Sequence, residues 1–189
     1  MRAFVAIEVP PPGGGPPGAG RAPDHLTLRF LGEIAPDRTA PIGDRLAAVA
    51  TRHPPFDLRI EGVGAFPSDA APRVVWFGAT VGREAATRLA EEVRAALRGE
   101  GDAPPEGPFV PHVTWFRVRS ADDRRAALDA IAGRRPVPPP RSVRVEEFLL
   151  KESVLGRGGA VHRTLATFRL GGASGAGDPS ASGPASPPP

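Results

Sequence analysis

The sequence twice places a histidine two residues before a threonine at the start of an apolar run. The first run reads H-L-T-L-R-F-L-G at 25–32, and the second reads H-V-T-W-F-R-V at 112–118. Short runs of this composition are typical of strands. Because side chains two apart on a strand share a face, each run presents an imidazole beside a hydroxyl while the residue between them points into a core. The chain must therefore fold around at least two half-buried strands.

The rest of the chain alternates between strand and helix patterns, which predicts an α+β fold. Helical spacing of apolar residues indicates helices over about 39–52 and 82–98, and a third that follows a capping box at Ser120 and ends at Gly133. The expected strands are 3–9, 25–31, 56–66, 73–80, 110–118, 142–153 and 163–170.

The order of these elements suggests an internal duplication. Strand, histidine strand, helix and strand over 3–66 are echoed over 73–153, where one more helix precedes the histidine strand. Two such lobes can pair about a pseudo-twofold axis with both histidine strands facing one cleft. In the first copy, residues 10–24 replace that helix with a loop of Pro and Gly, which do not form helices. We therefore expect one domain over 1–172 and a disordered Gly/Ser/Pro tail over 173–189.

Composition excludes several classes of protein. There are no cysteines, hence no disulfides, thiolate metal sites or cysteine nucleophiles. No segment is apolar enough to cross a membrane and the start is too short for a signal peptide, so we expect a cytoplasmic protein. Lys151 is the only lysine, so the basic residues are almost all arginine. Arginine suits forked binding of phosphate, although a general compositional bias toward arginine is the favoured explanation of the count alone.

His25 and His112 suit acid–base chemistry at phosphorus. Displacement at phosphorus needs a base on the attacking oxygen and an acid on the leaving oxygen, and histidine serves as either near neutral pH. The hydroxyls of Thr27 and Thr114 can donate to the non-bridging oxygens, where negative charge accumulates. A metalloenzyme is a weak alternative, because two histidines would need carboxylate ligands that neither motif supplies.

Two further residues follow from regular alternation along the same strands. Arg29 continues the His25 face at i+4, so it is expected to add a charge-assisted hydrogen bond to a phosphate. Phe116 continues the His112 face in the same way. Packing in the protein interior is the favoured interpretation, and stacking on a nucleobase is the alternative.

A third triplet, His162-Arg163-Thr164, differs from the other two. No Pro or Asp precedes it, its centre is charged, and it opens a terminal strand after a glycine-rich turn. We interpret it as structural. His53 closes a helix before two prolines, where interaction with the helix dipole is expected.

The two motifs resemble the paired His-x-Thr motifs of the two-histidine (2H) phosphoesterases, and in particular the RNA 2′,3′-cyclic phosphodiesterases, also described as 2′-5′ RNA ligases. R-A-F-V-A-I-E-V-P at the start, G-V-G-A-F-P at 62–67 and R-V-V-W-F-G at 73–78 agree with this family, as does K-E-S-V-L-G-R-G-G-A at 151–160. The resemblance implies a bilobal duplicated α+β fold in which two antiparallel sheets line a central cleft, with helices outside.

The resemblance also implies an activity. In this family a terminal 2′,3′-cyclic phosphate is hydrolysed to a 2′-phosphate without a metal or organic cofactor. By motif match His25 is the proton donor, His112 the proton acceptor, and Thr27 and Thr114 bind phosphate. The implied partners are RNA ends or nucleotides with a 2′,3′-cyclic phosphate, with no membrane partner, and we expect a monomer. Ligation of tRNA halves through a 2′-5′ bond and a non-catalytic RNA-binding role remain alternatives.

Overall fold

The computed structural model describes residues 1–10, 25–104, 107–156 and 159–171. They form strands and helices in the order β1 (Arg2–Glu8), β2 (His25–Glu33), the short 3₁₀ helix η1 (Pro36–Arg38), α1 (Thr39–Ala50), β3 (Phe56–Phe66), β4 (Val74–Val81), α2 (Arg83–Ala96), β5 (His112–Arg117), α3 (Ala121–Ile131), β6 (Arg141–Val145), β7 (Glu147–Gly156) and β8 (Gly159–Arg169). The alternation expected from the sequence is confirmed for all three α-helices and for most strands.

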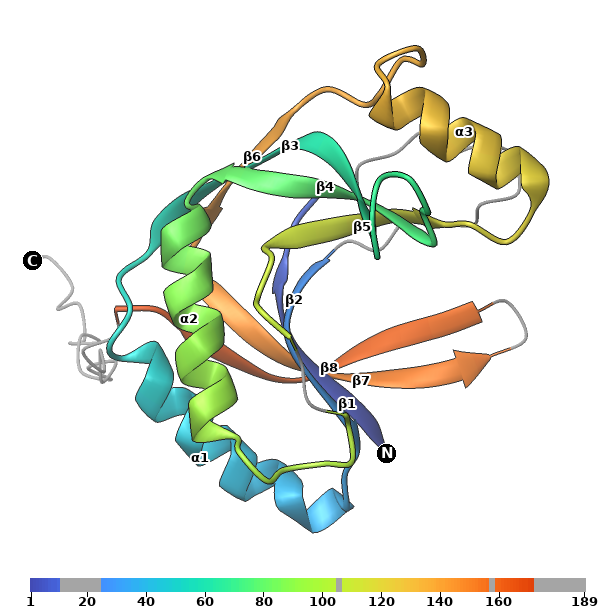
Figure 1. Cartoon of the computed structure of the whole chain (residues 1–189). Coiled ribbons are helices and arrows are strands. Elements are labelled where there is room, and N and C mark those ends of the chain that lie inside the picture. Colours follow the sequence, from blue (N-terminus) through green and yellow to red (C-terminus); the bar gives the residue numbers. More distant parts are fainter. Residues whose placement is uncertain (11–24, 105–106, 157–158, 172–189) are drawn as a thin grey trace, which may run out of the picture.

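The strands form two antiparallel sheets of four with equivalent layouts (Figure 1). The first has the order β2-β1-β7-β8 and the second β5-β4-β3-β6. In each sheet the histidine strand lies at an edge, beside the strand that precedes it in the sequence. β2 and β5 also contact each other. The fold therefore brings together two motifs that are far apart in the chain, and the expected α+β architecture with two antiparallel sheets is confirmed.

Neither sheet is built from one contiguous half of the chain. β3 pairs with β4 and β6 in the second sheet, whereas β7 and β8 join β1 in the first. The single strand expected over 142–153 is therefore wrong. It is two strands in different sheets, separated only by Glu146. An uninterrupted run of strand-forming residues does not reveal that the chain changes partners within it.

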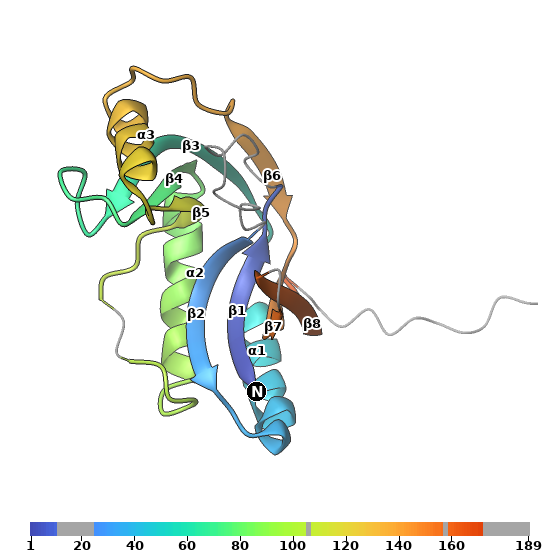
Figure 2. The ribbon, with the colours of Figure 1, turned by 90° about the vertical axis from the view of Figure 1, so that its right-hand side faces the viewer.

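The helices cover the faces of the sheets that turn away from the histidines. α1 and α2 lie side by side, α1 against β7 and β8 and α2 against β2 and β3, while α3 packs on β3 (Figures 1 and 2). Both sheets and all three helices contribute to one hydrophobic core, whose fully buried members include Val5, Leu28, Leu46, Leu89 and Val113. This shared core holds the two histidine strands in a fixed relation.

Two parts of the domain prediction lie outside the described residues. These are nearly all of the Pro/Gly loop, since 11–24 are not described, and the tail over 173–189. Within the part of the chain that is described, no helix combines the length and the apolar character that a membrane span requires.

Candidate active site

The register of β2 against β1 determines which side chains share a face with His25. Glu8 pairs with His25, Ala6 with Thr27 and Phe4 with Phe30. Residues opposite each other in an antiparallel pair point to the same side, so His25, Thr27 and Phe30 project from one face of the sheet. We call the face of each sheet that carries its motif histidine the site face.

Arg29 does not lie on this face. The register shifts between Val5 and Ala6, so Leu28 is an extra residue in β2, a β-bulge. The bulge reverses the alternation, and Arg29 pairs with Val5 on the opposite face. Its Nη1 donates to the carbonyl oxygen of Arg94 in α2 at 2.8 Å. The expectation that Arg29 continues the His25 face is therefore wrong.

β5 repeats this arrangement in the second sheet. Gly78 pairs with His112 and Trp76 with Thr114, so this histidine and threonine also share a face. The register then shifts, with Trp115 as the extra residue, and Phe116 pairs with Val75 on the other face. Phe116 is only 2% exposed and packs against the ring of Trp115 in the core. Phe116 therefore packs in the interior, as the favoured interpretation expects, and the alternative of stacking on a nucleobase is wrong.

The two bulges place on the site faces two residues that regular alternation would assign to the opposite faces. After the bulge in β5, Arg117 pairs with Val74 and returns to the site face, as Phe30 does in β2. Phe30 is 52% exposed and Arg117 is also exposed. The sequence places both residues at i+5 from a motif histidine, but nothing in it reveals the bulge that makes i+5 a site position.

His25 lies in an aromatic environment on the first sheet. It is buried, and its ring centroid is 4.9 Å from that of Phe4 and 5.1 Å from that of His162. Lys151, the only lysine, pairs with Phe4 across β1 and β7 and so lies on the same face. Its Nζ contacts the Glu8 carboxylate at 2.5 Å, and the lysine is buried. The site face of this sheet therefore holds an ion pair between a buried lysine and an exposed carboxylate, which sequence reasoning missed.

His112 is held by its backbone and by two aromatic rings. Its Nδ1 lies 2.7 Å from the carbonyl oxygen of Val110, and its ring packs against Phe66 and Trp76. Because a carbonyl only accepts, Nδ1 carries the hydrogen and the neutral ring keeps its lone pair on Nε2. Burial lowers the pKa of His112 from its ordinary value of 6.5, and the hydrogen bond to Val110 partly offsets this. The neutral form of the His112 imidazole is therefore favoured at physiological pH.

Glycine makes room for the ring of Trp76. A Cβ at Gly64, which pairs with Trp76, would lie 2.4 Å from the indole, and one at Gly78 would lie 3.1 Å from it. Side chains at these positions would displace the indole from the site face of β4. The glycines therefore make room for the indole of Trp76 beside His112.

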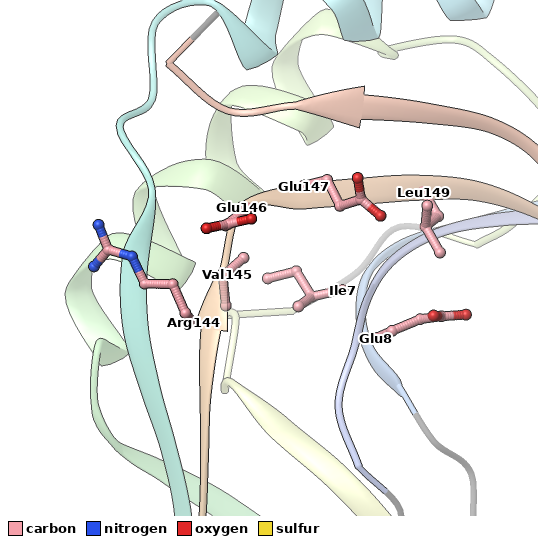
Figure 3. A pocket seen from close by; sticks show the side chains of 7 residues that line it. All are labelled: Ile7, Glu8, Arg144, Val145, Glu146, Glu147 and Leu149. Atoms are coloured by element: carbon pink, nitrogen blue, oxygen red, sulfur yellow. The ribbon is translucent and has the colours of Figure 1, made fainter.

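Neither of two surface hollows of about 280 Å³ each is lined by a motif histidine. One is lined by Ile7, Glu8, Arg144, Val145, Glu146, Glu147 and Leu149 (Figure 3). Its three carboxylates outnumber its one arginine, so it is unsuited to a phosphate. The other is lined by Arg29, Glu91, Arg94, Ala95 and Arg98 beside α2. Among the described residues, no three His, Cys, Asp or Glu side chains are grouped to hold a metal ion.

Comparisons with known proteins identify the family to which this chain belongs. Residues 5–154 match the family model described as the 2′-5′ RNA ligase superfamily. The RNA 2′,3′-cyclic phosphodiesterase of Aeropyrum pernix is 38% identical over 141 residues, which cover 75% of this chain and 78% of the relative. The protein of the same name from Aquifex aeolicus is 32% identical over 149 residues, covering 78% of each chain.

Solved structures agree with the sequence matches. TT0787 of Thermus thermophilus superposes with a TM-score of 0.66 at 28% identity, over 92% of this chain and all of that one. Escherichia coli LigT complexed with 3′-AMP gives a TM-score of 0.64 at 28% identity, covering 90% of this chain and 98% of that one.

Proposed function

Since this chain belongs to the 2′-5′ RNA ligase superfamily, we propose that it is an RNA 2′,3′-cyclic phosphodiesterase that opens a terminal cyclic phosphate to a 2′-phosphomonoester. Relatives at 32–38% identity that carry this name support the reaction class. The observation that carries the proposal is the matched register of two His-x-Thr strands at equivalent sheet edges that contact each other.

In the proposed reaction His112 is the base. Its Nε2 takes a proton from water while the water oxygen forms a bond to phosphorus. The lowered pKa of His112 supports this role, because the ring is already neutral when the substrate arrives. The bond from phosphorus to the 3′ oxygen breaks, and His25 donates a proton to that leaving oxygen.

Hydrogen-bond donors on the two site faces stabilise the negative charge on the phosphate oxygens. The hydroxyls of Thr27 and Thr114 donate to the non-bridging oxygens, where charge accumulates in the transition state. Arg117 replaces Arg29 as the proposed guanidinium ligand of the phosphate, because the bulge in β5 returns it to the site face. Protonation, deprotonation and hydrogen bonding account for every step, so the reaction needs no metal or cofactor.

The test is turnover of adenosine 2′,3′-cyclic phosphate in EDTA, with the products resolved by ³¹P NMR. We expect 2′-AMP as the only product and, for His25→Ala and His112→Ala, losses in kcat of about 10²- to 10⁴-fold each with folding intact. His53→Gln serves as the control, because His53 lies beyond α1 and pairs with Glu92 of α2. Full activity in either alanine variant would refute the assigned roles.

A second candidate function is ligation, which the family's description favours. A 5′-hydroxyl would replace water as the nucleophile, with the same base and the same donor, and would form a 2′-5′ bond. Incubation with tRNA halves separates the two, since ligation joins them and hydrolysis leaves them with a 2′-phosphate. Salt-sensitive RNA binding without turnover would instead favour a non-catalytic relative.

We also propose a domain organisation, a location and an oligomeric state for the protein. Residues 1–172 would act as one domain, in the cytoplasm and as a monomer, on RNA ends or nucleotides that carry a cyclic phosphate. Sedimentation of the purified chain tests the oligomeric state.

A further inference from the structure

The third His-x-Thr triplet reaches the candidate site. The ring of His162, in β8, lies 5.1 Å from that of His25 with the two planes at 87°. Phe4 contacts both rings, at 4.9 Å from each. These three rings, which we call the aromatic clamp, come from β1, β2 and β8. His162, which the sequence indicates to be a structural residue, therefore lies beside His25.

This contact requires a strongly curved sheet. β1 and β7 lie between β2 and β8, so a flat sheet would hold these edge strands about 14 Å apart. Figure 1 shows β7 and β8 crossing the view while β1 and β2 run steeply through it. His162 pairs with Ser153 and so shares its face with Lys151 and Phe4. The curvature therefore turns the site-face side chains of β8 toward β2.

We propose that His162 is a positioning residue for His25, which it holds against Phe4 in the orientation needed to protonate the leaving oxygen. A perpendicular ring contact restricts rotation of the His25 ring, which packs against both Phe4 and His162. Misplacement of a catalytic group by about 1 Å can cost on the order of 100-fold in rate. The inference rests on the proposed role of His25 as proton donor.

Two substitutions of His162 distinguish the role of its aromatic ring from the role of its ring nitrogens. His162→Phe keeps an aromatic ring without an ionisable nitrogen, whereas His162→Ala removes both. We expect His162→Ala to lower kcat by about 10-fold or more with KM changed less than about twofold, because orientation and not binding is lost. His162→Phe should recover kcat to within about threefold of the wild type. Val161→Ala is the matched control, since Val161 is the neighbouring residue on β8, points to the other face and is 66% exposed.

The outcomes are distinct. Undiminished kcat in His162→Ala would overturn the proposal. Equal losses in His162→Phe and His162→Ala, with unchanged melting temperatures, would also overturn it, because the imidazole itself would then be needed.

A measurement without substrate keeps this inference separate from the proposed function. The nuclear Overhauser effect between the ring protons of His25 and Phe4 should persist in the wild type and His162→Phe and weaken in His162→Ala. If the wild-type protein does not turn over cyclic phosphates, the proposed function fails. The ring contacts still decide whether His162 positions His25, and an unchanged signal in His162→Ala would refute the clamp.

Discussion

At the scale of single residues, the carbonyl of Val110 decides which nitrogen of His112 can act as a base. Accepting the Nδ1 hydrogen fixes the tautomer, and the rings of Phe66 and Trp76 bury the imidazole so that its pKa falls. Folding favours the neutral ring, so its stabilising contribution is complete above pH 6.5 and is lost as the pH falls through the lowered pKa. The tautomer and the lowered pKa thus both favour the proposed role of His112 as the base.

The pH dependence of kcat/KM should report this burial. The acidic limb of the profile, where His112 gains its proton, should lie below pH 6.5 in the wild type. Phe66→Ala exposes the ring to water, so the pKa of His112 should rise and the acidic limb should move to higher pH. Val81→Ala, at a site 50% exposed on β4, is the control. An acidic limb that stays in place or moves to lower pH in Phe66→Ala would contradict the assignment.

The two arginines near the motifs should respond differently to substitution. Arg117→Ala should lower kcat/KM by about 10- to 100-fold, because it removes the charge-assisted hydrogen bond that we propose Arg117 makes to the phosphate. Arg29→Ala should leave kcat/KM within about threefold and reduce stability slightly, because Arg29 lies on the opposite face of β2 and binds the Arg94 carbonyl. Steady-state kinetics and thermal melts of both variants make the comparison. A larger kinetic loss in Arg29→Ala would restore the role that alternation had assigned to it.

At the scale of elements, the sequence predicts what local pattern controls. The capping box of α3 is present, with Ser120 Oγ accepting from the Asp123 amide and Asp123 accepting from the Ser120 amide. The expected placement of His25 and Thr27 on one face is also confirmed. Both residues come before the bulge at Leu28, so the regular alternation of the strand still applies to them. The bulges at Leu28 and Trp115 could not be predicted, because buried apolar residues occupy them as they would occupy a regular strand. The positions of Arg29 and Phe116 were therefore assigned to the wrong face.

Trp115 should be costly to remove, although it is the extra residue of its strand. It is 1% exposed and packs against the rings of Phe77 and Phe116. Trp115→Ala should lower the free energy of unfolding by about 3–5 kcal/mol, since it leaves a cavity in the core. Urea denaturation followed by circular dichroism measures the change. A loss below about 1 kcal/mol would show that the bulge is not anchored by this ring.

At the scale of the whole molecule, the candidate site depends on an exchange of strands between the two sheets. β3 lies in the sheet of β5, and β7 and β8 lie in the sheet of β2, so each histidine is supported by residues from both halves of the chain. His162 reaches His25 only through this exchange. Long-range pairing of this kind leaves no local trace in the sequence, which explains why two lobes could be predicted but not their strand composition.

The central claim is that His25 and His112, from separate sheets, act as one unit on a single phosphate. The kcat of His25→Ala, His112→Ala and the double variant on adenosine 2′,3′-cyclic phosphate in EDTA tests it most directly. Groups that act as a unit are not additive, so we predict that the double variant is no slower than the slower single variant, within about threefold. Losses that multiply in the double variant would show that the two histidines act independently, and would contradict this account.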